Sequence, residues 1–413
     1  MDILQAKLAV IAAGKRLLET GLIARTWGNV SCRVNETQFV ITPSGRAYEN
    51  LTPEEIVLVS AADLSYEGGI KPSSEKGIHA QAYLLRPEVN FVVHTHQHNA
   101  SIVSVMGREI SGVNAKQAAL LGTTIPLAGY GLPGTGKLRK GVTAALRQHP
   151  GSKAILMAHH GALCMGKDAE EAFQVADTLE QACAKFLSQK LLEVTGEIAE
   201  TVSGIHKLLA AKRAQRQRRI SAPPLQACTS FRSGDAAFCI TPGDKGETLD
   251  VSLKSGKVLN GAEEYPEALE LHRAIYLKDK KTNAIIHSKK ADILHASASG
   301  AKRLKPFLDD FAQIAGVNLR LAQFDPANQL ESANAAQKLL RRRSALLLAD
   351  NGALCTGKDL EEARAVELVT EKNCAVSLSA DLFKQVRAIG AIDAALMRLI
   401  YVKKYSKQKT KKQ

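Results

Sequence analysis

The feature that most constrains the fold of this chain is an internal repeat that spans almost its whole length. The motif Phe39–Pro43 (Phe-Val-Ile-Thr-Pro) recurs as Phe238–Pro242 (Phe-Cys-Ile-Thr-Pro), an offset of 199 residues. Gly161–Ala172 recurs as Gly352–Ala363 at an offset of 191, and histidine-bearing motifs between these two are offset by 193. Matches that keep their order at nearly constant separation indicate a tandem duplication in which copy two has lost a few loop residues.

The repeat also places the domain boundaries. Copy one is predicted over residues 1–197 and copy two over 198–402, followed by a lysine-rich, disordered tail over 403–413. Apolar residues at helical spacing predict an opening helix in copy one. Its counterpart in copy two is the basic stretch from Ile205 through Arg219, which we expect to end near Pro223.

Within copy one the hydrophobic pattern alternates between short strands and longer helices. Buried strands are predicted at 39–42, 91–94 and 154–157, and helices at 75–85 and 169–194. Each copy is therefore predicted to be an α/β domain in which helices cover a sheet.

Composition excludes several function classes. No run of about 18 apolar residues is present, so a membrane span is not expected. The N-terminus lacks the apolar segment of a secretory signal. The seven cysteines include no Cys-x-x-Cys pair, which favours reduced thiols in a cytoplasmic compartment.

A net charge of +14 leaves a nucleic-acid or anionic-surface role open. The basic residues gather in three clusters: Lys212, Arg213, Arg216, Arg218 and Arg219; Arg341–Arg343; and the tail from Lys403 to Lys412. Aromatic residues make up only 5%, however, and no recognisable nucleic-acid-binding motif accompanies the charge. We therefore expect solvated helix faces and a disordered tail, unless the clusters converge on one face of the fold.

Two histidines stand at the end of a predicted strand in copy one. His94 and His96 are residues i and i+2 of the run that begins at Phe91, so their side chains point to the same face. Such a pair alone is as often structural as metal-binding. A third imidazole is available where the strand from Ala154 runs out into His159-His160-Gly161. Three neutral imidazoles around an open position are the ligand set of a catalytic zinc ion, so we expect a metal centre here.

Short polar segments that contain glycine or serine accompany these histidines. They are Gly28-Asn29-Val30-Ser31, Thr42-Pro43-Ser44-Gly45 and Ser73-Ser74, whose amides and hydroxyls suit a phosphate group. Glu75 follows directly and opens a predicted helix, with Ser73 or Ser74 as the N-cap and Glu75 in the first turn. Helix capping alone would explain this carboxylate, so a catalytic role for it rests on its neighbours.

In combination and in this order, the motifs resemble the class II aldolase and adducin family. The resemblance covers copy one almost entirely and copy two more faintly. It implies that each domain is built on a central, mainly antiparallel sheet. It further implies His94, His96 and His160 as ligands of Zn²⁺ or another divalent metal such as Mn²⁺, and Glu75 as the acid/base. The substrate phosphate would be held by Gly28, Asn29, Ser44, Gly45, Ser73 and Ser74.

The function implied by the resemblance is that of a metal-dependent lyase, which cleaves a small sugar phosphate through a metal-stabilised enediolate. An epimerase or dehydratase of the same fold is an alternative, although glutamate rather than aspartate at position 75 favours an aldolase. A non-catalytic, adducin-like interaction protein is a second alternative, against which the retained histidines argue. Aldolases of the family use a tyrosine from a neighbouring subunit; Ala115 occupies that position here, and Tyr130 is a candidate substitute.

Copy two lacks most of this set of residues. Glu75 becomes Ala268, His96 becomes Lys289 and His160 becomes Asn351, so that only His94 keeps a counterpart histidine, His287. In the phosphate segments, Gly28-Asn29 becomes Ala227-Cys228 and Ser44-Gly45 becomes Gly243-Asp244. Copy two is therefore predicted to keep the fold without the chemistry. Family members are typically ring-shaped tetramers, so two chains are expected to build one four-domain ring.

Overall fold

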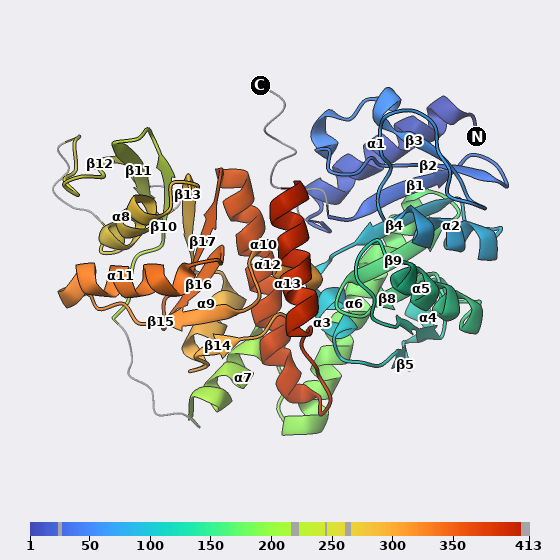
Figure 1. The fold of residues 1–413 in the computed structure, drawn as a ribbon. Coiled ribbons are helices and arrows are strands. Elements are labelled where there is room, and N and C mark those ends of the chain that lie inside the picture. Colours follow the sequence, from blue (N-terminus) through green and yellow to red (C-terminus); the bar gives the residue numbers. More distant parts are fainter. Residues whose placement is uncertain (24–26, 216–222, 244–245, 261–265, 406–413) are drawn as a thin grey trace. The chain divides into compact units, whose positions relative to one another are not determined.

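A computed structural model of the chain describes residues 1–413 except 24–26, 216–222, 244–245, 261–265 and 406–413 (Figure 1). The chain divides into two compact units. The first comprises Met1–Val202, Leu382–Arg387 and Val402–Gln413, and the second comprises Ser203–Asp381 and Ala388–Tyr401. Among the described residues, no helix is both long enough and apolar enough to cross a bilayer.

The first unit is built on a seven-stranded sheet in the order β3-β2-β1-β4-β9-β8-β7. Every neighbouring pair is antiparallel except β7 and β8, and β5 pairs with β6 in a separate small sheet. The strands are β1 (Asn29–Arg33), β2 (Gln38–Ile41), β3 (Val57–Ser60), β4 (Phe91–Thr95), β5 (Ile110–Ser111), β6 (Thr124–Ile125), β7 (Leu127–Ala128), β8 (Ala154–Met157) and β9 (Gly161–Gly166).

The second unit repeats this topology in an eight-stranded sheet of order β12-β11-β10-β13-β17-β16-β15-β14. Only β15 and β16 run parallel. The predicted duplication of a mainly antiparallel α/β domain is thus confirmed. The strands are β10 (Cys228–Arg232), β11 (Ala237–Pro242), β12 (Leu249–Ser252), β13 (Ala284–Ser288), β14 (Arg303–Leu304), β15 (Leu319–Ala322), β16 (Ala345–Leu348) and β17 (Gly352–Gly357).

Among the described residues, the helices of copy one recur in the same order in copy two, which ends with a further helix, α13. In copy one they are α1 (Ile3–Glu19), α2 (Lys76–Leu85), α3 (His98–Ser104), α4 (Ala115–Leu121), α5 (Gly136–Gln148) and α6 (Ala169–Thr195). Those that follow are α7 (Val202–Gln215), α8 (Leu269–Lys278), α9 (Ala291–Ala298), α10 (Asp309–Ile314), α11 (Gln329–Leu340), α12 (Leu360–Ser379) and α13 (Ala391–Ile400).

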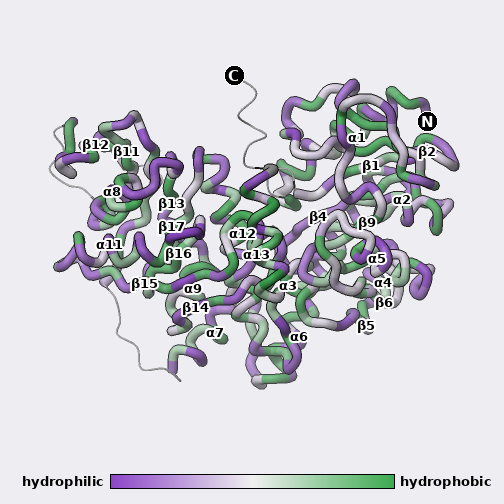
Figure 2. Tube along the Cα trace, in the orientation of Figure 1, coloured by the Kyte–Doolittle hydropathy of each residue, from purple (hydrophilic) through white to green (hydrophobic). Residues whose placement is uncertain are grey.

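In each unit the sheet is the middle of three layers. In copy one, Leu163 and Met165 of β9 pack against Ile78 of α2 and Leu138 of α5. Cys164, between them, points to the other face because successive strand residues alternate, and α6 lies against β4 and β9 on that face. Copy two places α8 and α11 on one face and α9 and α12 on the other. Helices such as α6 alternate between hydrophilic and hydrophobic residues, as expected of helices that cover a sheet (Figure 2).

Two details differ from the prediction. The opening helix of copy two, expected over 205–219, is α7 at Val202–Gln215, and residues 216–222 lie outside the described residues. The tail expected to be disordered from residue 403 instead continues α13 as a π-helical turn, Tyr401–Tyr405, and residues 406–413 lie outside the described residues. All seven cysteines are free and buried.

Candidate metal centre

The first histidine of the site is fixed by its place in the sheet. His94 lies on β4, paired with Asn29 of β1 on one side and Leu163 of β9 on the other. Its Nδ1 donates to the carbonyl oxygen of Ala162 at 2.9 Å, which leaves the Nε2 lone pair facing the site. Burial lowers the pKa of His94 well below its ordinary value. The ring is therefore neutral and oriented, as a metal ligand must be.

The hairpin between β8 and β9 delivers a second histidine to the same place. Met157 and Gly161 close the hairpin, and the residues between them carry His160 over β4. A Cβ atom at Gly161 would lie 2.2 Å from the carbonyl oxygen of Thr95. Only glycine permits this close approach of the hairpin to β4.

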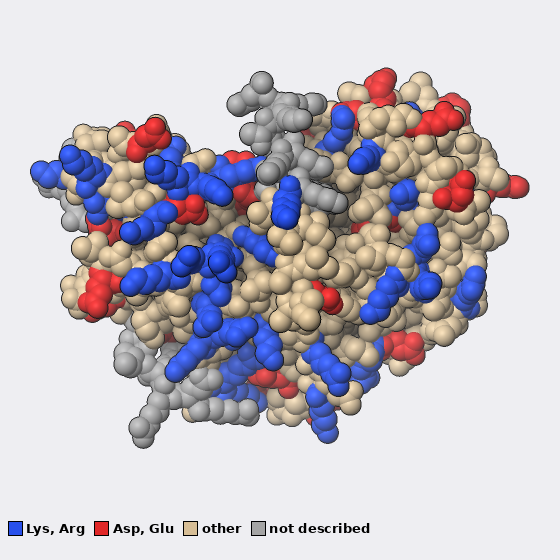
Figure 3. Space-filling model, in the orientation of Figure 1, with Lys and Arg blue, Asp and Glu red and all other residues tan. Residues whose placement is uncertain are grey.

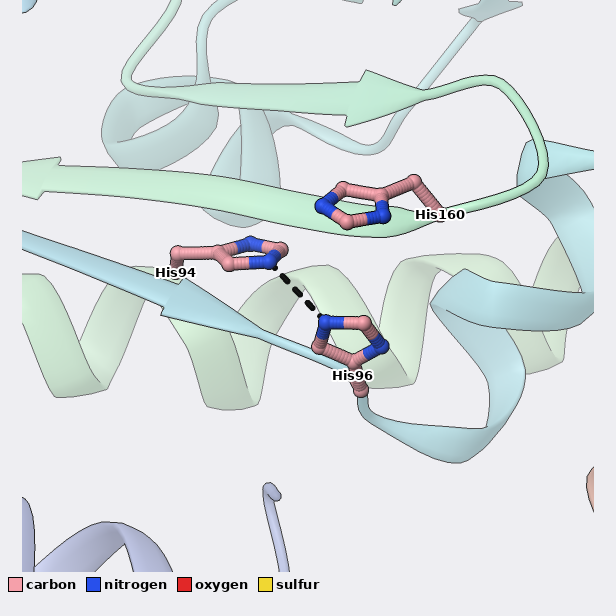
Figure 4. Close-up of side chains that lie close together, drawn as sticks. All are labelled: His94, His96 and His160. Atoms are coloured by element: carbon pink, nitrogen blue, oxygen red, sulfur yellow. Dashed lines mark hydrogen bonds between the residues drawn. The ribbon is translucent and has the colours of Figure 1, made fainter. Parts of the chain in front are cut away.

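His94, His96 and His160 converge as predicted (Figure 4). One ring nitrogen from each lies within 4.8 Å of the others, and all three side chains are buried. The Nε2 atoms of His94 and His96 are 3.0 Å apart, close to the separation of about 3.3 Å for two nitrogens on one tetrahedral zinc ion. No other group of three metal-ligating side chains is found in the described part of the chain. The donor set therefore fits a divalent metal ion.

The side chain of Glu75 faces these histidines. Glu75 occupies the N-cap position of α2, but its side chain makes no capping hydrogen bond. The predicted N-cap at Ser73 or Ser74 is therefore wrong: the Ser73 hydroxyl instead accepts a hydrogen bond from the Glu75 amide at 3.2 Å. The Glu75 carboxylate is thereby directed into the site, with Oε1 at 2.8 Å from His160 Nε2 and Oε2 at 3.3 Å from His94 Nε2.

The charge state of Glu75 follows from its surroundings. Burial opposes its ionisation, but the neighbouring His160 and His94 rings and the hydrogen bond from Asn29 outweigh this effect. The pKa of Glu75 accordingly lies well below its usual range. The carboxylate is ionised and held against two of the three imidazoles, where it can accept a proton.

A chain of hydrogen bonds through the interior holds Glu75 in place. Asn29 Nδ2 donates to Glu75 Oε2 at 3.0 Å, and Asn29 Oδ1 accepts from His79 Nε2. His79 Nδ1 must then accept from the Ser31 hydroxyl at 2.6 Å, and Ser31 accepts from the Tyr83 hydroxyl at 2.6 Å. Burial lowers the pKa of His79 to about 3, so the ring stays neutral and the direction of the chain is fixed.

The sequence analysis did not predict this chain of hydrogen bonds, although the repeat preserves part of it in copy two. Ser230, His272 and Tyr276 form the same contacts in copy two, at 2.7 Å and 2.8 Å from the Ser230 hydroxyl. In copy two the chain ends at Cys228, whose sulfur lies 3.4 Å from His272 Nε2. The hydrogen bonds among serine, histidine and tyrosine are therefore common to both copies. The link from the histidine through Asn29 to a carboxylate is found in copy one.

The predicted phosphate-binding residues lie on two adjoining loops and on β1. The amide of Ser44 donates to the Lys71 carbonyl at 2.9 Å, and the amide of Ser73 donates to the Thr42 carbonyl at 3.0 Å. These bonds join the loops beside Glu75 and engage two of the amides expected to bind phosphate. The groups left for an anion are the hydroxyls of Ser44 and exposed Ser74, the Gly45 segment and the second N–H of the buried Asn29 amide, whose other N–H donates to Glu75.

Gly28 has a structural role of its own. A Cβ atom there would lie 2.6 Å from the carbonyl oxygen of His94, and the residue has a φ of +107°. Glycine at this position therefore allows β1 to approach the end of β4 that carries His94. The Gly28 carbonyl accepts a hydrogen bond from Tyr48 at 2.7 Å.

The corresponding place in copy two is filled by internal hydrogen bonds. His287 turns its Nε2 to the carbonyl oxygen of Asn351 at 2.7 Å, so the nitrogen that faces the site in His94 carries a proton here. The Asn351 side chain accepts from the Leu225 amide at 2.7 Å and donates to the carbonyls of Pro223 and Ala349. Ala268, at the N-cap of α8, supplies no carboxylate. Asp244, predicted to repel a phosphate, lies outside the described residues.

The two candidate positions for a tyrosine differ in their surroundings. Ala115 is the first residue of α4 and is exposed. The ring of Tyr130 packs edge-on against that of His159 at a centroid distance of 5.3 Å, next to His160 in the chain.

Comparison with known proteins decides the family. Residues 8–187 and 244–378 both match the Class II Aldolase and Adducin N-terminal domain. The chain belongs to the class II aldolase and adducin family. The two matched stretches fall one in each copy, so the family domain occurs twice in tandem.

Several aldolases are similar to a part of this chain that has the length of one copy. L-fuculose phosphate aldolase of Escherichia coli (strain K12) is 37% identical over 168 residues, which are 41% of this chain and 76% of that protein. The 5-methylthioribulose-1-phosphate/5-deoxyribulose-1-phosphate aldolase of Rhodospirillum rubrum is 32% identical over 177 residues, 43% of this chain and 78% of that protein. Among solved structures, L-fuculose-1-phosphate aldolase from Thermus thermophilus is 27% identical, covers 47% of this chain and 98% of its own, and gives a TM-score of 0.40.

Proposed function

We propose that copy one is a divalent-metal-dependent aldolase that cleaves a small, phosphorylated ketose. The observation that carries this proposal is the placement of one ionised carboxylate, Glu75, within 2.8 Å and 3.3 Å of two of three clustered imidazoles. The similarity to aldolases whose names specify fuculose phosphate and methylthioribulose phosphate supports the choice of substrate class.

His94, His96 and His160 would hold the ion, which we expect to be Zn²⁺ or a similar divalent metal. When bound, such an ion supplies Lewis-acid polarisation of the substrate carbonyl and stabilises the negative charge of an enediolate. Glu75 lies where it can take a proton from a substrate hydroxyl and return it to carbon, because its oxygens face the same space as the ring nitrogens. Asn29 and His79 keep that carboxylate from rotating away.

The proposed binding site for the substrate phosphate is formed by the two loops beside Glu75 that the Ser44–Lys71 and Ser73–Thr42 hydrogen bonds join. Gly28, Asn29, Ser44, Gly45, Ser73 and Ser74 were the predicted residues. We assign direct contacts to the Ser44 and Ser74 hydroxyls, the Gly45 segment and Asn29, because the amides of Ser44 and Ser73 already donate within the protein. Gly28 acts by letting β1 approach β4.

Copy two is proposed to be a non-catalytic domain of the same fold. His287, the one histidine that copy two keeps at the three metal-site positions, donates to a backbone carbonyl. Asn351 binds the segment from Pro223 to Leu225 where copy one presents His160. An epimerase or dehydratase that uses the same groups in copy one is the alternative reaction type, since Ala115 leaves the family tyrosine position without a proton donor.

The reaction is tested by incubating the metal-loaded full chain with a panel of ketose 1-phosphates and measuring release of dihydroxyacetone phosphate with a coupled dehydrogenase. We expect cleavage of at least one compound. Epimerised product without cleavage would favour the epimerase, and no conversion of any compound by metal-loaded protein would contradict an aldolase.

Assembly gives a further prediction. We expect two chains to associate, because each chain already carries two of the four domains of the ring that family members typically form. Light scattering of the purified chain at micromolar concentration should give about twice the chain mass of 44.4 kDa. A strictly monomeric mass would contradict the four-domain ring.

A further inference from the structure

Five arginines of copy two, far apart in the sequence, gather on one surface. We define the arginine patch as Arg303 on β14, Arg320 on β15 and Arg341–Arg343 in the turn between α11 and β16. Arg303 and Arg320 are directly opposite each other on the two antiparallel strands. Figure 3 shows Lys and Arg side chains crowded over β14 and β15, with few acidic ones among them.

The patch lacks internal charge compensation. None of its five arginines forms an ion pair within the described residues. Two of the nearby acids, Asp309 and Asp310, are buried, and Asp310 pairs with Lys372. Asp325, five residues after Arg320, is exposed, but its carboxylate accepts hydrogen bonds from the Ala327 amide and the Asn328 side chain of its own turn. Burial, together with the charges of Arg320 and Arg303, lowers the pKa of Arg343. Like charges directly across two strands are destabilising, so this arrangement is unfavourable unless an anion neutralises it.

Copy one serves as an internal comparison, because strand register identifies the matching positions. Leu304 pairs with Leu319 as Ile110 pairs with Ile125, so Arg303 corresponds to Glu109. Leu321 pairs with Leu347 as Leu127 pairs with Leu156, so Arg320 corresponds to Pro126.

The turn shows the same change. Arg341-Arg342-Arg343 precedes β16 as Pro150-Gly151-Ser152 precedes β8. The five positions that are arginine in copy two therefore hold no basic residue in copy one. The copy without the clustered histidines is the copy that carries the patch.

The backbone at the centre of the turn is unusual. Arg342 has a φ of +65°, a left-handed conformation that is unfavourable for a side chain of its type. Arg343 is braced beside it, with its Nε donating to Asn318 Oδ1 at 3.0 Å and one terminal nitrogen donating to the Leu339 carbonyl at 3.0 Å. The turn thus holds arginines in a fixed geometry at some cost in backbone energy.

We propose that the arginine patch binds double-stranded nucleic acid through its phosphate backbone, without reading base sequence. Guanidinium groups donate in pairs to phosphate oxygens, and repeated phosphates suit a row of arginines better than a single small anion does. Lys302 and Lys305, both exposed, extend the positive surface beyond Arg303.

The composition of the surface favours a duplex over two other polyanions. Proteins that bind single strands stack bases on exposed aromatic side chains. Proteins that bind at membrane surfaces insert apolar ones. No large apolar or aromatic side chain is exposed over residues 300–325 or 338–345, and Phe311 and Phe324 are buried. The patch is therefore suited to contacts with phosphates alone.

Fluorescence anisotropy of the full chain with a labelled duplex of about 20 base pairs tests this proposal, at salt concentrations from about 50 to 200 mM. The variant is Arg303→Gln/Arg342→Gly, which should fold because copy one already has glycine at the second position. Each lost phosphate contact should reduce the slope of log K against log salt by about 0.9. We expect the slope to fall by about two and the affinity to fall on the order of tenfold at about 100 mM salt.

The matched control is Lys140→Gln/Arg147→Gln, which removes two exposed charges from α5, the counterpart of α11 in copy one. It should change the affinity by less than about twofold. An equal loss of affinity for the duplex in both double variants would show that binding depends on net charge alone, and would overturn the proposal that the arginine patch is the binding site. Absence of duplex binding at about 50 mM salt, tighter binding to a single strand, or binding only to vesicles of anionic lipid would each overturn the proposal. A chelator in all samples keeps the result independent of the metal centre.

Discussion

Replacing His160 by asparagine, the residue that copy two carries at this position, should abolish metal binding and with it all cleavage activity. The side-chain amide is a weak ligand compared with a neutral imidazole, and only two histidines would remain of the three that converge within 4.8 Å. The fold should survive, because copy two adopts the same hairpin with Asn351 before its glycine. Elemental analysis of the purified chain should fall from about one divalent ion per chain to almost none.

The matched control for this variant is His287→Ala in copy two. His287 donates its Nε2 to the Asn351 carbonyl, so its removal should lower stability without changing the metal content. If the metal disappears from His287→Ala and remains in His160→Asn, the active copy has been assigned wrongly. Wild-type protein that retains no divalent ion after purification and reloading would contradict a metal centre altogether.

The convergence of the three histidines could be predicted because it depends on local rules. His94 and His96 share a face through strand alternation, and His160 stands where a neighbouring strand runs out. The duplication, the fold class and the replacement of site residues in copy two could also be predicted from the sequence, because comparing two copies of one pattern shows which positions have changed.

The features that sequence reasoning missed depend on contacts between distant segments. Ser73 and Ser74 resemble helix caps locally, yet the bonds from Ser44 to Lys71 and from Ser73 to Thr42 fix this loop and make Glu75 the cap position. The arginine patch could not be predicted from the sequence for the same reason. Arg303 and Arg320 meet only because β14 pairs with β15, and the run Arg341–Arg343 was interpreted as part of a solvated surface.

Replacing Glu75 by glutamine should lower the rate of cleavage by about 10²–10⁴ while leaving the metal content and the fold in place. Glutamine keeps the shape and can still accept the hydrogen bond from Asn29, but it cannot take up and return a proton. The three histidines remain to hold the ion. Steady-state cleavage of the best substrate, measured beside elemental analysis and thermal unfolding, separates a lost proton acceptor from a lost metal.

A second substitution, Glu75→Ala, distinguishes the acid/base role from a positioning role. Copy two tolerates alanine at this N-cap, where Ala268 begins α8, so the variant should fold. Alanine removes the acceptor for Asn29 as well as the titrating group, so its rate should be as low as that of Glu75→Gln or lower. If the Glu75→Gln variant retains more than about a tenth of the wild-type rate while the Glu75→Ala variant does not, Glu75 acts by holding Asn29 in place. If both variants lose the metal, Glu75 is a fourth ligand and the proton acceptor must be sought elsewhere, with Tyr130, whose ring contacts that of His159, as the first candidate to test.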